Sequence, residues 1–238
     1  MSEKTSAIPG LDGNVLVIAA HPDDELLGCG GTIARMSDAG QEVHIAIFGE
    51  GITSRHAERS EADQAELDAL HTTAQQVAGL LGAASLHLYQ LPDNRFDSLP
   101  MLEVVKPIEE LIEKLQPEII FTHSGGDLNV DHVVLHRATL TATRPMAGHP
   151  VKQLYSYEVP SSTEWSFGQF EPVFRPGLFV DIAETLERKV AGMALYESEV
   201  RTFPHPRSGE ALRMIAKRWG SVVGLPAAEA FELIRAIR

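Results

Sequence analysis

Residues 15–20 read VLVIAA and residues 21–25 read HPDDE, and this junction of an apolar run with a polar cluster decides the fold. An uninterrupted apolar run is typical of a β-strand that is covered on both faces, as in a parallel sheet. The polar cluster then lies at the carboxyl end of that strand, where open α/β sheets bind their ligands. The junction therefore predicts an α/β protein whose chemistry begins at residue 21.

The same alternation of apolar runs and amphipathic stretches continues along the chain. A helix-like stretch follows the first strand and ends at Gly40, since glycine commonly terminates helices. The further strands expected in the first half are 42–48, 86–91 and 118–123, with helices over 57–81 and 101–115. Strands and helices in alternation predict an α/β sandwich around a mostly parallel sheet with right-handed crossovers.

Beyond residue 151 the pattern changes to that of a C-terminal cap on the sheet. We expect short strands at 154–159 and 178–182, and helices over 183–200, 209–223 and 227–237. No repeat or long linker divides the chain, so we predict a single domain over 1–238, with 1–12 as a flexible N-terminal tail.

The composition argues against several classes of protein. The 238 residues carry 20 Lys+Arg against 33 Asp+Glu, a formal net charge of −13. Because nucleic-acid binding depends on basic side chains that neutralise phosphates, this acidic balance argues against a nucleic-acid partner. No stretch approaches the roughly 20 apolar residues of a membrane span. A single Cys forms no internal disulfide, which favours the reducing cytoplasm as the location.

The cluster at 21–25 has the residue types of a metal site. His21 and Asp24 are three residues apart, so both face one point if the loop turns into a helix, and Asp23 points in a neighbouring direction. Two adjacent carboxylates beside a histidine are electrostatically unfavourable without a cation. His with Asp suits Zn²⁺ or another divalent metal, which keeps a position open for water when the protein supplies three ligands.

A third ligand is expected from the carboxyl end of another strand. The predicted strand 118–123 runs into a glycine-rich loop and then into Asp131 and His132 at the start of a helix. His132 is the expected ligand, and Asp131 would orient a histidine ring or contribute charge.

Other segments at the predicted rim offer weaker candidates for substrate binding. Arg55 follows the predicted strand 42–48, and His205 and Arg207 lie in a proline-bounded loop. Arg55 would hold a hydroxyl or an anionic group of the substrate, or else be a solvated loop charge, and the loop of His205 and Arg207 would contact the substrate at the rim. Trp165 lies in an aromatic loop, where packing of the cap is the expected role.

Together these motifs resemble the LmbE-like, or PIG-L, family of zinc-dependent N-acetyl-sugar deacetylases. The resemblance rests on AHPDDE at 20–25, GCGGTI at 28–33 and DLNVDH at 127–132, with weaker echoes down to AEAF at 228–231.

The resemblance implies a Rossmann-like three-layer fold with zinc held by His21, Asp24 and His132. It also implies Asp23 as the general base that activates water. The chemistry agrees with this assignment, because zinc polarises the acyl oxygen and a nearby free carboxylate takes a proton from the water.

The chain departs from the family pattern at two places. Many members have His-Pro-Asp-His where this chain has NVDH, so Asn129 replaces a histidine that stabilises an oxyanion or protonates the leaving group. Asn donates a hydrogen bond but delivers no proton. Proton transfer then falls to Asp23 alone, or to one of His123, His136 and His205. Many members also carry an Arg before the third strand, and near Leu70 there is none.

We therefore predict a zinc-dependent hydrolase that removes an acetyl group from an N-acetylated amino sugar or sugar conjugate of the N-acetylglucosamine type. The alternatives are a metal-dependent hydrolase of another small amide or ester, and a non-catalytic metal-containing binding protein. The expected partners are a small-molecule sugar substrate and, by analogy with the family, further copies of the chain in a homo-oligomer.

Overall fold

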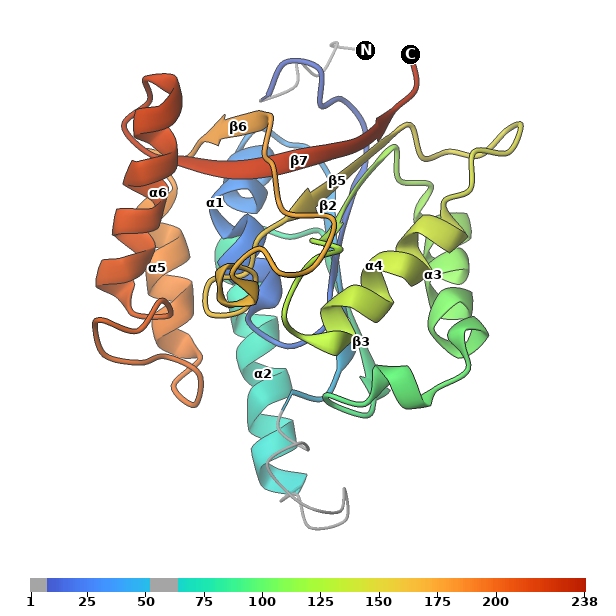
Figure 1. Ribbon diagram of the computed structural model, residues 1–238, viewed down its shortest axis with the longest axis horizontal. Helices are drawn as coiled ribbons and strands as arrows, with labels where there is room; N and C mark the ends of the chain where they lie inside the picture. The colour runs from blue at the N-terminus through green and yellow to red at the C-terminus, as the bar shows by residue number, and fades with distance from the viewer. Residues whose placement is uncertain (1–7, 52–63) are drawn as a thin grey trace.

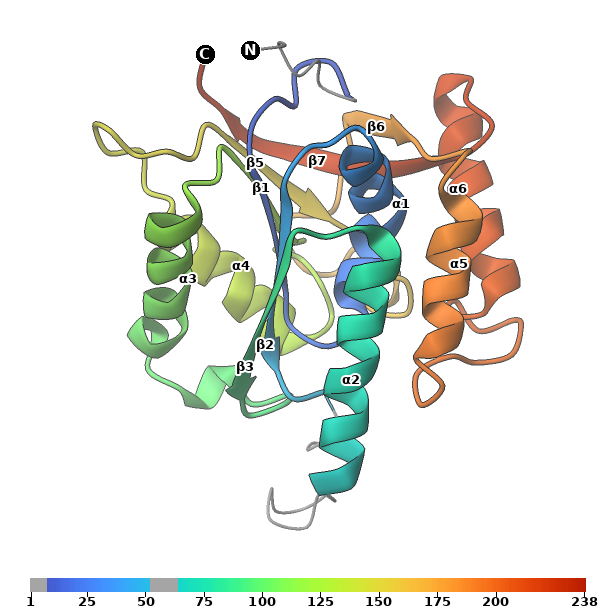
Figure 2. The ribbon, with the colours of Figure 1, turned by 180° about the vertical axis from the view of Figure 1, so that it is seen from behind.

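Figures 1 and 2 show a central sheet with helices on both of its faces. The computed structural model describes residues 8–51 and 64–238. Within them the sheet has seven strands in the order β3-β2-β1-β4-β5-β7-β6. They are β1 (Val15–Ala19), β2 (Val43–Gly49), β3 (Ser85–Leu91), β4 (Ile119–His123), β5 (Gln153–Tyr157), β6 (Leu178–Asp181) and β7 (Ala228–Ala236). Neighbouring strands from β3 to β5 pair in parallel, and β7 runs antiparallel to both β5 and β6.

The helices form two layers, one on each side of the sheet (Figures 1 and 2). One layer holds α3 (Met101–Leu115) and α4 (Val130–Ala142), and the other holds α1 (Asp24–Asp38), α2 (Gln64–Leu81), α5 (Leu186–Leu195) and α6 (Gly209–Val223). Two short 3-10 turns are η3 (Phe96–Ser98) and η4 (Glu164–Ser166). The predicted three-layer α/β sandwich with a mostly parallel sheet is confirmed. Among the residues that the structure describes, none of the helices combines the length and the hydropathy needed to cross a bilayer.

Strand β1 explains why the run at 15–20 is apolar throughout. All five residues of β1 are buried. Val15, Val17 and Ala19 belong to the core on the side of α1 and α2, whereas Leu16 and Ile18 belong to the core on the side of α3 and α4. Successive side chains of a strand point to opposite faces, so a strand between two helical layers needs apolar residues at every position.

The prediction of a helix over 227–237 is wrong, because this segment forms strand β7. The strand pairs with β5 on one side and with β6 on the other. Its Phe231 is fully buried and packs edge-on against Phe121 of β4, with the ring centroids 4.8 Å apart. The Ala and Glu residues of this segment favour a helix locally, but helix propensity is weak and pairing with two neighbouring strands overrides it.

Two further segments differ from expectation in extent. Helix α5 covers only residues 186–195 of the helix expected over 183–200. Ile8 and Leu11 fall inside the segment expected as a flexible tail, yet both are buried in the core. Burial of apolar side chains lowers the free energy of the folded chain, which favours this packing.

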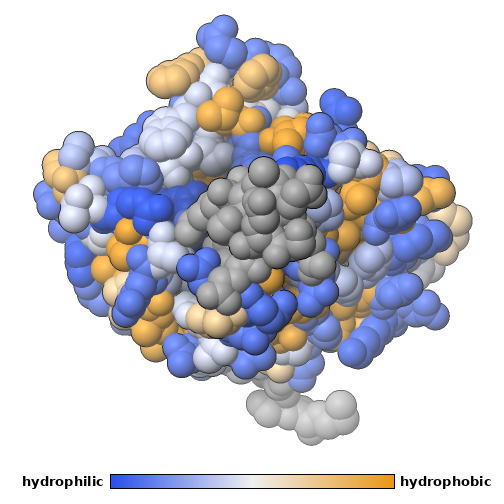
Figure 3. Space-filling view, turned by 90° about the horizontal axis from the view of Figure 1, so that it is seen from below, coloured by the Kyte–Doolittle hydropathy of each residue, from blue (hydrophilic) through white to orange (hydrophobic). Residues whose placement is uncertain are grey.

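The order of the strands reverses between β1 and β4, and the candidate site forms there. After β1 the chain enters α1 on one face of the sheet, whereas after β4 it enters α4 on the other face. Ligands of open α/β sheets bind outside the carboxyl ends of the strands at such a reversal. Figure 3 views the molecule from this end and shows hydrophobic residues scattered among hydrophilic ones.

Candidate active site and metal centre

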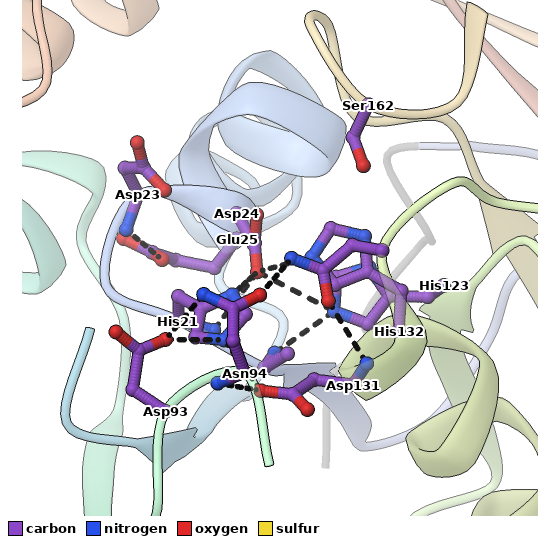
Figure 4. Close-up of polar contacts among 12 residues, drawn as sticks. His21, Asp23, Asp24, Glu25, Asp93, Asn94, His123, Asp131, His132 and Ser162 are labelled. Atoms are coloured by element: carbon purple, nitrogen blue, oxygen red, sulfur yellow. Dashed lines mark hydrogen bonds and ion pairs between the residues drawn. The ribbon is translucent and has the colours of Figure 1, made fainter. Parts of the chain in front are cut away.

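Three of the predicted residues meet between the first turns of α1 and α4. His21, Asp24 and His132 place their ligand atoms within 4.8 Å of one another. Asp24 Oδ2 lies 3.4 Å from His21 Nδ1 and 3.2 Å from His132 Nε2 (Figure 4). The structure thus brings together the ligand set that the family resemblance implies.

The backbone after β1 turns sharply to aim these side chains. Asp23 has φ 112° and ψ −25°, in a region that residues other than glycine rarely adopt. The turn lets the backbone N–H of His21 donate to Asp24 Oδ2 at 2.8 Å. Helix α1 also needs a close approach to β5, because a Cβ atom on Gly28 would lie 2.2 Å from the ring of Tyr157.

The second nitrogen of His21 is held by two carboxylates. His21 Nε2 lies 3.0 Å from Asp131 Oδ2 and 3.1 Å from Asp93 Oδ1. Asp131 is itself fixed, because it accepts hydrogen bonds from the backbone N–H groups of Asn94 at 2.6 Å and Phe96 at 2.9 Å. A carboxylate that accepts from Nε2–H leaves Nδ1 as the lone-pair nitrogen that can bind a metal.

His132 also has a carboxylate, that of Asp127, next to its second ring nitrogen. His132 Nδ1 lies 3.1 Å from Asp127 Oδ1. Burial alone would lower the pKa of His132, but the charges of Asp24 and Asp127 raise it to about 9. Burial alone would raise the pKa of Asp127, but His132 and the hydroxyls of Ser162 and Thr163 lower it to about 2. These carboxylates therefore stabilise a positive charge at the ring, which a metal ion supplies as well as a proton does.

The residues present fit a divalent metal. Both ring nitrogens of His132 are buried, and neither of its carboxylate contacts has the angular geometry of a hydrogen bond. Two imidazoles and one carboxylate leave a fourth position open, as is typical of catalytic zinc sites. A second group of His21, Asp93 and Asp131 also has ligand spacing, but Asp131 already accepts two backbone hydrogen bonds and one from His21.

Asp23 lies beside the candidate metal ligands His21, Asp24 and His132, which we call the metal group, but is not one of them. Its side chain is 2% exposed, and Arg207 Nη1 donates to its Oδ2 at 2.9 Å. Arg207 is held in turn by Glu199 at 3.1 Å and by Ser161 at 2.8 Å. Burial raises the pKa of Asp23, Arg207 opposes the shift, and the neighbouring carboxylates Asp24 and Glu199 add to it. A carboxyl with a raised pKa suits proton transfer near neutral pH.

Asn129 has a structural task at the start of α4. Its side-chain oxygen caps the helix by accepting from the backbone N–H of Asp131 at 2.9 Å. Its amide nitrogen donates to Asn94 Oδ1 at 2.9 Å. Asn129 nevertheless lines the same cavity as Asp23 and His132.

The alternative proton donors lie outside this cavity. His123 is fully buried, accepts from the backbone N–H of Ala20 at 2.8 Å, and stacks on His132 with centroids 3.9 Å apart. Burial lowers the pKa of His123 and of His136, whose Nδ1 lies 2.8 Å from the carbonyl oxygen of His123. His205 packs edge-on against Trp165 at 5.6 Å.

The cavity in front of the metal group has a volume of about 580 Å³. Of the three residues predicted to bind substrate, Arg207 lines it, His205 does not, and Arg55 lies outside the described residues. Sequence reasoning did not assign roles to Asp93, Asp127 or Glu199. Asp93 follows a predicted strand by two residues, so the strand-end rule that selected His21 also points to it.

The chain is similar to known bacterial enzymes over most of its length. It is 26% identical over 241 residues to the 1D-myo-inositol 2-acetamido-2-deoxy-alpha-D-glucopyranoside deacetylase of Mycobacterium sp. (strain JLS), with 82% of this chain and 76% of that protein covered. It is 26% identical over 196 residues to the 4-oxalmesaconate hydratase of Pseudomonas putida, with 76% and 71% covered.

A solved structure shares the fold of this chain, and a family model matches its sequence. The solved structure of N,N'-diacetylchitobiose deacetylase from Pyrococcus horikoshii has a TM-score of 0.74 at 21% identity, over 93% of this chain and 84% of that one. A family model described as PIG-L, GlcNAc-PI de-N-acetylase, matches residues 16–143. Because this match covers more than half of the chain and includes both segments that build the site, the chain belongs to the PIG-L deacetylase family.

Proposed function

We propose that the protein is a metal-dependent hydrolase that removes the acetyl group from an N-acetylated amino sugar. The observation that carries the proposal is the position of Asp23, a buried carboxyl beside the group of His21, Asp24 and His132 and in the wall of the same cavity. A base placed next to three metal ligands is the arrangement that activates water against an amide. Membership of the PIG-L family makes an N-acetyl group the expected amide.

The ion proposed for the site is Zn²⁺, held by His21, Asp24 and His132. When bound, it would polarise the acyl oxygen and lower the pKa of a water molecule. A hydrogen bond from His21 Nε2–H to Asp131 would leave Nδ1 of that ring for the metal. The charge of Asp127, 3.1 Å from His132 Nδ1, favours a proton on Nδ1 and so leaves Nε2 of His132 for the metal.

Asp23 carries the proton transfers. It takes a proton from the attacking water and then delivers it to the amine nitrogen as the C–N bond breaks, so that acetate and a free amine leave. Arg207 holds the carboxyl in place through its 2.9 Å contact with Oδ2. Asn129 delivers no proton, and its amide is engaged with Asn94, so we assign both transfers to Asp23.

The inner cavity suits a neutral, hydroxylated substrate. Asp93, Asn94, Ser162 and Arg207 line it and offer both donors and acceptors of hydrogen bonds. The carboxylates Asp23 and Asp93 would repel an anionic group close to the metal, which favours an acetamido sugar without charge at that position.

The test is a substrate panel assayed for released acetate with the metal content measured in parallel. We expect acetate and a free amine from N-acetylglucosamine or its glycosides, loss of activity on chelation, and recovery on adding Zn²⁺. Acetate from another amide or an ester, but not from the sugars, would instead support a hydrolase of different specificity. Hydration of 4-oxalmesaconate without acetate release would favour the reaction type named for the Pseudomonas relative.

A metal-loaded protein that turns over none of these compounds would support the non-catalytic alternative. The cytoplasmic location and the homo-oligomer stay predictions. They are tested by cell fractionation and by the molecular mass in solution.

A further inference from the structure

The active-site cavity changes in polarity between its buried end and its mouth. At the buried end Asp23 and His132 are each 2% exposed. At the mouth the same cavity is lined by three hydrophobic side chains with large exposed fractions, which are Leu128 at 50%, Val130 at 38% and Trp165 at 40%. We call these three residues the apolar mouth.

The segment 127–131 explains why Leu128 and Val130 face outward. Its polar residues alternate with them and are all engaged within the protein: Asp127 contacts His132, Asn129 caps α4 and bonds to Asn94, and Asp131 contacts His21. Because the metal ligands and the helix cap require the polar side chains inside, the two apolar residues between them are left in solvent.

Hydrogen bonds hold the loop that carries Trp165 against the segment that carries Leu128. The hydroxyls of Ser162 and Thr163, which precede η4, both donate to the carboxylate of Asp127. Figure 4 shows Ser162 reaching toward the metal group from the loop that carries η4. Since Leu128 directly follows Asp127, these bonds join the two segments that carry the apolar mouth.

A pyranose ring that places its acetamido group at Asp23 occupies only part of a cavity of about 580 Å³. Its hydroxyls would find donors and acceptors at Asp93, Asn94 and Arg207. A free sugar offers little apolar surface to the apolar mouth, whereas an apolar substituent would cover these exposed hydrophobic side chains and lower the free energy of binding.

We propose that the natural substrate is an N-acetylated amino sugar with an apolar aglycone, alkyl or aryl, that lies against Leu128, Val130 and Trp165. The inference rests on the proposed function and adds to it the class of the group attached to the sugar. The aglycone is remote from the bond that breaks, so its contacts act on ground state and transition state alike and lower KM more than they change kcat.

The experiment compares methyl and octyl glycosides of N-acetylglucosamine, each below the concentration at which the octyl compound forms micelles. The zinc-loaded wild-type protein should show kcat/KM for the octyl glycoside roughly tenfold or more above that for the methyl glycoside. The difference should reside in KM.

Variants locate the group that recognises the aglycone. Leu128→Ser and Trp165→Ala should each reduce the octyl-to-methyl ratio severalfold. Leu102→Ser is the matched control, because Leu102 lies on α3, is 64% exposed and does not line this cavity. Met214→Ser tests a second cavity of about 600 Å³, which Met214, Phe174 and Trp219 help to line.

Each result decides the inference. A ratio near one in the wild-type protein, with acetate released from both glycosides, overturns it and leaves the proposed function standing. A high ratio that persists in Leu128→Ser and Trp165→Ala, or is lost only in Met214→Ser, overturns the assignment to the apolar mouth. If no glycoside releases acetate, the proposed function fails and the inference fails with it.

Discussion

Replacement of Asp23 by Asn tests the role of the buried carboxyl directly. The variant keeps the shape of the side chain and an oxygen that can accept from Arg207 Nη1, which lies 2.9 Å from Asp23 Oδ2 in the wild-type protein. It also suits the backbone, because Asn adopts positive φ more readily than most residues and Asp23 has φ 112°. The change therefore removes the ability to accept and deliver a proton, and with it the charge opposite Arg207, which keeps its contact with Glu199 at 3.1 Å.

The expected magnitude follows from the position of the residue. General acid–base catalysis by a positioned side chain contributes roughly 10²–10⁴-fold to the rate. Asp23 is only 2% exposed and is assigned both proton transfers, so the loss in kcat should lie toward the upper end of this range. A loss of 10⁴ corresponds to about 5.4 kcal/mol in the activation free energy.

The assay is acetate release at saturating substrate, with bound zinc and the thermal unfolding midpoint measured on the same preparations. Metal content should be unchanged, because Asp23 is not in the ligand group. Asp97→Asn, an exposed aspartate in η3, is the matched control and should keep full activity. Asp23→Asn with full metal and more than about a tenth of the wild-type kcat would refute the assignment of the base.

Three further predictions concern the metal, the sheet and pH. Asp127→Asn should lower zinc affinity roughly 10–100-fold, since Asp127 Oδ1 lies 3.1 Å from His132 Nδ1; competition with a chelator measures this, and unchanged affinity would contradict the orienting role. Phe231→Ala should cost about 3–5 kcal/mol in urea unfolding, because the ring is fully buried; a cost under about 1 kcal/mol would argue against strand β7. Burial lowers the pKa of His44 below its ordinary value of 6.5, so the unfolded chain takes up the proton first and stability falls as pH falls through about 6.5. His44→Gln should reduce the loss of stability between about pH 7.5 and 5.5, measured as urea midpoints, and an unchanged loss would exclude His44 as a contributor.

The sequence was informative wherever one strand or helix suffices to place a residue. The apolar run at 15–20 predicts a strand buried on both faces, and the polar residues after it must then stand at the carboxyl edge of the sheet. The same rule placed His132 near that edge, and the structure brings it to His21 and Asp24. These positions follow from where the strands end in the sequence, because the carboxyl ends of parallel strands share one edge of the sheet.

Tertiary structure decided everything that depends on a partner distant in the chain. The segment 228–236 has residues that favour a helix, yet it is a strand, since β5 and β6 flank it on both sides. Asn129 occupies a catalytic position of the family pattern, yet its side chain is engaged by the helix cap and by Asn94, 35 residues away. Arg207 meets Asp23 across 184 residues. Local periodicity determines which faces are apolar and where strands end, but hydrogen bonds and ion pairs between remote segments depend on distances that only the packed chain defines.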